Sequence, residues 1–113
     1  MRQVRQYIER PMKKALLYIH GKGGCASECE HYRPLFPGYE VIGLDYHTFS
    51  PRETGTEIRS AVAKLKQEFE TIILIANSIG AFFSMNAGID AMIQKAYLIS
   101  PIVDMEKNSM HLL

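Results

Sequence analysis

The chain has 113 residues, of which 47% are hydrophobic and 22% are charged, a composition typical of one globular domain. Thirteen basic residues oppose twelve acidic ones, so the net charge of +1 gives no reason to expect a nucleic acid or a membrane surface as a partner. No run approaches the roughly 20 apolar residues of a membrane span, and no apolar segment follows the basic N-terminal residues. We therefore expect a cytoplasmic protein without a secretory signal.

Four short apolar runs predict buried strands. Each run is continuous rather than alternating, which is typical of strands that are covered on both faces. Their starts lie about 25 to 30 residues apart, which leaves room for a helix between each pair, so the spacing predicts βαβ units and a parallel sheet. The four runs are residues 15–19, 41–44, 72–76 and 96–99.

Three helices are expected between these strands. The clearest follows the segment Ser-Pro-Arg-Glu at 50–53, which fits a capping box with proline at the first helical position. Gly55 weakens its first turns, so a later start is the alternative. The other two helices are expected at residues 26–32, ending before Pro34, and at 79–87, ending at Gly88. The apolar face of the clearest helix has 3.6-residue spacing: Ile58, Val62, Leu65 and Phe69.

The two cysteines lie four residues apart, at Cys25 and Cys29, with His31 nearby. A structural metal site needs about four ligands of this kind, and the sequence has no second cluster to complete one. We expect two reduced thiols, no bound metal and no cofactor.

Polar and glycine-rich residues follow all four predicted strands. The carboxyl ends of parallel strands meet at one edge of a sheet, where open α/β folds bind their ligands. This edge is therefore the predicted site. The residues that follow the strands are the loop 20–24, Asp45, the pair Asn77-Ser78, and the pair Ser100-Pro101.

Ser78 follows the third apolar run and has a small residue two positions before it and another two positions after it, Ala76 and Gly80. This pattern is typical of a nucleophile elbow, in which a strand turns sharply into a helix and exposes a hydroxyl. The amide of Ile79 would then point toward a developing oxyanion. A serine that only caps the following helix has the same local sequence, so this segment alone leaves both interpretations open.

The loop after the first strand reads His20-Gly21-Lys22-Gly23-Gly24. Glycines let a backbone approach a ligand closely and expose its amides. The amide of Lys22 would be a second oxyanion donor, and the alternative is a plain glycine-rich turn.

Taken in chain order, these segments resemble the first half of an α/β-hydrolase. The resemblance implies a three-layer α/β fold with a four-stranded parallel sheet in the order 2-1-3-4. It also implies a serine acyl hydrolase of the esterase, lipase or peptidase kind, acting on a small-molecule ester or amide through an acyl-enzyme. Ser78 would be the nucleophile, with the amides of Lys22 and Ile79 as the oxyanion hole. The supporting loop and turn positions would be His20, Gly21, Gly23, Ala76 and Gly80.

The family's triad continues from the serine to an Asp or Glu and then to a histidine after the last strand. This chain ends at Leu113, soon after its fourth strand. Asp104 is a candidate acid, with a surface or helix-capping role as the alternative, and His111 matches no family position. We therefore expect residues 1–113 to form a single, incomplete hydrolase-like domain, a truncated form with weak or no activity.

Two alternatives belong to other functional classes. Residues 21–26 also fit the pattern G-x-G-x-x-A after a strand, and Asp45 lies about where a ribose-binding acid would be, so a dinucleotide-binding module is one alternative. The other is a non-catalytic domain that pairs with a copy of itself. Exposed sheet edges recruit strands from other chains, so a homodimer through residues 96–99 is expected.

Overall fold

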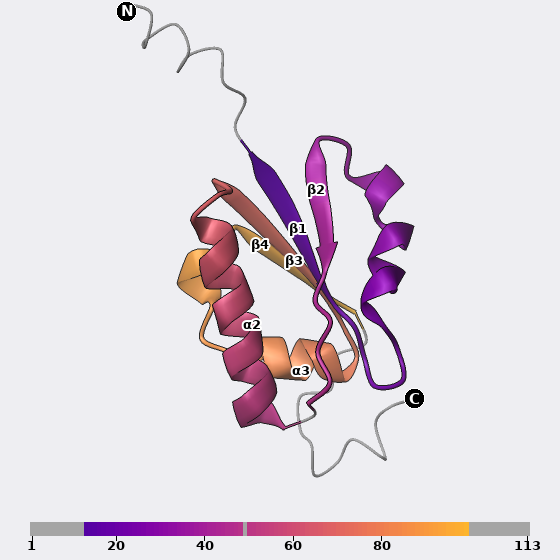
Figure 1. Ribbon diagram of the computed structural model, residues 1–113, viewed down its shortest axis with the longest axis vertical. Helices are drawn as coiled ribbons and strands as arrows, with labels where there is room; N and C mark the ends of the chain where they lie inside the picture. The colour runs from indigo at the N-terminus through magenta and orange to yellow at the C-terminus, as the bar shows by residue number, and fades with distance from the viewer. Residues whose placement is uncertain (1–12, 49, 100–113) are drawn as a thin grey trace, which may run out of the picture.

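The computed structural model describes residues 13–48 and 50–99 of the chain (Figure 1). Its four strands are all parallel and lie in the order β2-β1-β3-β4, which confirms the predicted sheet and strand order. The α-helices (α) and 3₁₀ helices (η) lie between the strands. In chain order the elements are β1 (Lys14–Ile19), η1 (Ala26–His31), η2 (Arg33–Leu35), β2 (Tyr39–Gly43), α2 (Pro51–Lys66), β3 (Thr71–Asn77), α3 (Ile79–Met85), η3 (Asp90–Met92) and β4 (Lys95–Ile99).

The two central strands, β1 and β3, are buried on both faces. Leu17 of β1 is in register with Ile42 of β2 and Leu74 of β3, so apolar side chains stack across the sheet. One face packs on α2 and α3, and the other on η1 and η2 (Figure 1). This three-layer arrangement explains why the apolar runs are continuous, because every position of a central strand meets one of the two covering layers.

Helix α2 begins where the sequence predicts. The Ser50 Oγ accepts a hydrogen bond from the Glu53 backbone N–H at 3.1 Å, and Pro51 occupies the first turn. Gly55 does not delay the start of the helix, which begins at Pro51. Gly55 is buried, and a Cβ at this position would lie 3.7 Å from the Ala87 Cα. A Cβ at this distance would make ordinary van der Waals contact, so the packing against Ala87 does not require glycine.

The helix predicted over 26–32 is present as a 3₁₀ helix. Two successive 3₁₀ helices, η1 and η2, occupy this segment. The Glu28 amide donates to the Cys25 carbonyl oxygen and the Tyr32 amide to the Cys29 carbonyl oxygen, each three residues back. η1 ends at His31, before Pro34 as predicted, and Pro34 lies in the first turn of η2. Proline has no N–H for an α-helical bond, so short 3₁₀ turns suit this segment better.

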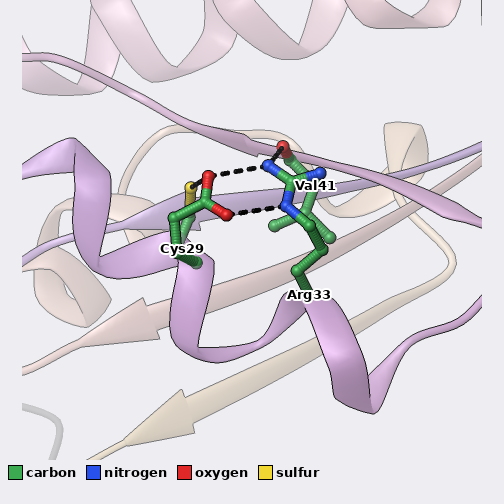
Figure 2. A network of polar contacts seen from close by, with 4 residues as sticks. Cys29, Arg33 and Val41 are labelled. Carbon is green, nitrogen blue, oxygen red and sulfur yellow. Dashed lines mark hydrogen bonds and ion pairs between the residues drawn. The ribbon is translucent and has the colours of Figure 1, made fainter.

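The 3₁₀ helices η1 and η2 are anchored on β2. The Arg33 guanidinium binds the Glu30 carboxylate through two hydrogen bonds of 2.7 and 2.8 Å, and it also donates to the Val41 carbonyl oxygen at 3.2 Å (Figure 2). The backbone of Ala26 lies against Gly43, where a Cβ would overlap it. Together these contacts anchor η1 and η2 on β2.

Candidate active site

Ser78 lies at a bend in the chain, where the sequence predicts the elbow. Ser78 lies between the last residue of β3 and the first residue of α3, with φ 56° and ψ −121°. Within residues 13–48 and 50–99 it is the only non-glycine residue with a positive φ. Such a conformation is strained for a residue with a Cβ, and strain of this kind concentrates at functional sites. An ordinary N-cap serine has extended backbone angles, as Ser50 has, and bonds to the helix, whereas Ser78 makes no side-chain cap bond.

The small residues around Ser78 have a steric reason. A Cβ at Gly80 would lie 2.5 Å from the His20 carbonyl oxygen and 2.9 Å from that of Ile19. Ala76 is fully buried in register with Ile19. The elbow therefore packs directly on the carboxyl end of β1, and this close approach requires glycine at position 80.

The glycine-rich loop lies beside the nucleophile candidate. A Cβ at Gly21 would lie 3.1 Å from the Ser78 Cβ and 3.8 Å from its Oγ. The loop then turns back, because the Gly24 amide donates to the Gly21 carbonyl oxygen at 3.0 Å and Gly23 has φ 83°. A positive φ at the third residue is what a type II turn needs. Lys22 is exposed at the second position of this turn.

The Ile79 amide follows Ser78 in the sequence, and Lys22 follows Gly21, which packs against Ser78. Among the backbone hydrogen bonds of the described turns and loops, neither the Lys22 amide nor the Ile79 amide is a donor. Amides of this kind are available to a ligand. Lys22 lies in the loop after β1 and Ile79 is the first residue of α3, so the two amides come from different segments of the chain.

His20 has a structural role in this arrangement. Its ring is buried and stacks on the Tyr46 ring, with 4.2 Å between centroids, and its Nδ1 donates to the Gly21 carbonyl oxygen at 2.6 Å. The Tyr46 hydroxyl donates to the His20 carbonyl oxygen. Burial, followed by the charge of Glu57, raises the pKa of Tyr46 to about 12, so this hydroxyl keeps its proton at neutral pH. His20 and Tyr46 together hold the start of the loop.

A second polar group beneath the loop was missed by the sequence analysis. The Tyr18 hydroxyl donates to the Glu28 Oε1 at 2.7 Å. Burial, followed by the Glu28 carboxylate, raises the pKa of Tyr18. The available signal was a tyrosine in an otherwise apolar strand, since a buried hydroxyl needs a partner. This hydrogen bond connects β1 to η1.

The other sequence candidates lie apart from Ser78. Asp45 and His47 form an exposed pair, with 3.3 Å between the His47 Nε2 and the Asp45 Oδ1, after β2, and β1 separates β2 from β3. His31 is exposed and meets the Tyr32 ring edge-on. Ser100, Pro101, Asp104 and His111 lie outside the described residues. Among the described histidines, none hydrogen-bonds Ser78, so they do not supply an evident base.

The two cysteines are free thiols that differ in environment. Cys25 is exposed and Cys29 is buried, and burial is the main reason that the pKa of Cys29 is raised. In residues 13–48 and 50–99, no three His, Cys, Asp or Glu side chains are grouped so as to hold a metal ion. Over the same residues, no helix is long and apolar enough to cross a membrane.

The geometry also bears on the dinucleotide alternative. A Cβ at Gly24 would lie 2.8 and 2.9 Å from the two Glu28 carboxylate oxygens. In the dinucleotide fingerprint this part of the loop accepts a pyrophosphate at the start of an α-helix. Here a carboxylate occupies that place and a 3₁₀ helix follows, so the loop is poorly suited to an anionic ligand.

Comparison with known proteins gives three results. No family model matches the chain. The chain is 34% identical over 110 residues to a protein of Mycoplasma genitalium named putative esterase/lipase 3, covering 86% of this chain and 40% of that protein. It therefore spans about two fifths of that relative's length.

Two solved structures share the fold. Both are the lipase BlEst2 of Bacillus licheniformis, in its mature form and in its propeptide form. Each gives a TM-score of 0.66 at 19% identity over 81% of this chain, which corresponds to 42% of the mature chain and 23% of the propeptide form. The sequence similarity to an esterase/lipase and the shared lipase fold together support a relationship to the α/β-hydrolases.

Proposed function

We propose that this chain carries the nucleophile half of a serine acyl-hydrolase site, with an ester or amide as substrate. Ser78 is the nucleophile, and the amides of Lys22 and Ile79 bind the oxyanion. The observation that carries the proposal is the positive φ of Ser78 at the bend between β3 and α3, with Gly21 packed against its side chain. The similarity to a named esterase/lipase supports the same reaction class.

The chemistry requires a base that the described residues do not supply. The Ser78 Oγ would attack the substrate carbonyl, lose its proton to a base, and form an acyl-enzyme that water later hydrolyses. His20 does not fit the role of the base, because its ring is buried against Tyr46 and its Nδ1 is bonded to Gly21. A triad contributes on the order of 10⁶-fold to kcat in a serine protease, so we expect the 113-residue chain to hydrolyse p-nitrophenyl acetate slowly or not at all.

The elbow can be tested separately from the base by replacing the hydroxyl with a thiol. A thiol is partly ionised near neutral pH and reacts without an adjacent base. In a Cys25→Ser background, we expect Ser78→Cys to be acylated by p-nitrophenyl acetate at least about tenfold faster than Ser60→Cys, because a single oxyanion donor contributes about 10²-fold or more. Ser60 is exposed on α2 and provides the matched control. Acylation is followed by intact mass.

Equal acylation rates for the two thiols would contradict the proposal. So would rapid turnover by the native chain that persists in Ser78→Ala, because the reaction would then occur elsewhere. Rapid turnover that is lost in Ser78→Ala would keep the nucleophile but overturn the expected weak activity. NAD is expected to leave the melting temperature unchanged, and a clear rise would favour the dinucleotide alternative.

A further inference from the structure

Two tyrosines from opposite faces of the sheet form hydrogen bonds beside the loop 20–24. The Tyr46 hydroxyl donates to the His20 carbonyl oxygen, where the loop begins, and Tyr46 packs in the core between the sheet and the helices α2 and α3. The Tyr18 hydroxyl donates to the Glu28 carboxylate, and Tyr18 packs in the core on the opposite face, together with Cys29 of η1. The first bond is made to the loop itself, whereas the second is made to a side chain.

The Glu28 side chain lies against the end of the loop. A Cβ at Gly24 would lie 2.8 and 2.9 Å from the two carboxylate oxygens, so the carboxylate fills the space that a side chain at position 24 would occupy. The Gly24 amide closes the turn, because it donates to the Gly21 carbonyl oxygen at 3.0 Å. Gly21 in turn packs against Ser78. Lys22 therefore lies in a short turn with one end on Ser78 and the other end on Glu28.

Glu28 is fixed in place although it is exposed. Its Oε1 accepts the Tyr18 hydroxyl at 2.7 Å, and its amide donates to the Cys25 carbonyl oxygen at 3.1 Å. Tyr18 is only 2% exposed, and its ring contacts the Tyr32 ring with 5.5 Å between centroids. Hydrogen bonds to an ionised acceptor are among the stronger ones in proteins. A buried residue thus holds the carboxylate of an exposed one beside the loop.

We propose that Glu28 is a positioning residue of the oxyanion hole, which keeps the Lys22 amide in place through Gly24 and the turn. The inference rests on the proposed function, and Glu28 itself does not touch the substrate. Oxyanion donors are effective because they are fixed before the reaction, and a misplacement of about 1 Å can cost about 10²-fold in rate. A free glutamate side chain samples many rotamers, so the bond to Tyr18 is what suits Glu28 to this role.

The acylation rate of a thiol at position 78 measures the placement of the amide. In the same background as before, with Ser78→Cys, we expect Glu28→Ala to lower the rate at least about fivefold, because a displaced donor stabilises the oxyanion less. Glu28→Gln keeps an acceptor for Tyr18 and should recover most of the lost rate. Glu30→Ala is the matched control. It removes a carboxylate of η1 that binds Arg33 instead, and it should leave the rate unchanged.

Two further variants separate positioning from a general loss of structure. Tyr18→Phe keeps the ring in the core and removes only the hydroxyl, so it should lower the rate as Glu28→Ala does. The double variant should lower the rate no further, because both changes break the same hydrogen bond. A pH profile of each variant allows the rates to be compared at full ionisation of the thiol, so that a change in the thiol pKa is not counted as a change in positioning.

The failure of this inference differs from the failure of the proposed function. If Ser78→Cys is acylated faster than Ser60→Cys and Glu28→Ala leaves that advantage unchanged, only the positioning role is overturned. The same holds if Tyr18→Phe and Glu28→Ala act additively, or if Glu30→Ala slows acylation as much as Glu28→Ala. Equal rates for Ser78→Cys and Ser60→Cys overturn both proposals. Circular dichroism checks that each variant is folded, and Tyr18→Phe gives the reading if Glu28→Ala does not fold.

Discussion

The two edges of the sheet contrast sharply. At β2, Arg33 donates to the Val41 carbonyl oxygen, and the backbone of η1 lies so close that residue 43 must be glycine. At β4, all five side chains are exposed and no described element lies along the outer edge. Both strands are short and rich in apolar residues, so strand composition does not decide which edge is closed. What decides it is whether a neighbouring segment brings a donor and a close-packed backbone to the strand.

Adding a larger side chain to each edge strand should give the largest difference in stability between β2 and β4. Gly43→Val should lower the free energy of unfolding by at least about 2 kcal/mol, because its side chain overlaps the Ala26 backbone, which cannot rotate away. Ala96→Val on the open edge should change it by less than about 0.5 kcal/mol. Urea unfolding of both variants checks this. Similar losses in both would remove the contrast.

Truncation of apolar side chains should give a smaller difference in the same direction. Val41 of β2 is buried, whereas Leu98 of β4 is 36% exposed. We expect Val41→Ala to lower the free energy of unfolding by about 2 kcal/mol, since it removes buried carbons and leaves a cavity. Leu98→Ala should lower it by less than about 1 kcal/mol. A larger loss for Leu98→Ala would show that β4 is covered in solution even in the monomer.

Alkaline pH should lower the free energy of unfolding through the hydroxyl of Tyr18. Folding raises the pKa of Tyr18 above its ordinary value of 10, so the folded state holds a proton that the unfolded state releases. The resulting stabilisation is fully present below pH 10 and is lost as the pH rises through the folded-state pKa. Tyr18→Phe should therefore lose less stability than the native chain between pH 9 and about pH 11. Parallel stability curves in urea titrations would argue against this effect.

The sequence predicted the elements that depend on local pattern. Continuous apolar runs identified all four strands, and the Ser50 cap identified the start of α2. The small residues at 76 and 80 predicted the elbow, because its steric demand is local. The 3₁₀ form of η1 was missed, since its residues also fit a short α-helix. The Tyr18–Glu28 bond was missed because its partners come from different layers and meet only in the folded chain.

The positive φ of Ser78 has a thermodynamic consequence for the whole domain. A residue with a Cβ in that conformation stores roughly 1–3 kcal/mol of strain, which the packing of β1, β3 and α3 must hold. Glycine would adopt the same backbone angles with less strain. For stability alone, position 78 would therefore favour glycine over serine. Among the described residues, Ser78 is the one non-glycine residue with a positive φ, a conformation that disfavours a side chain. The buried sheet beneath Ser78 supplies the free energy that offsets this strain.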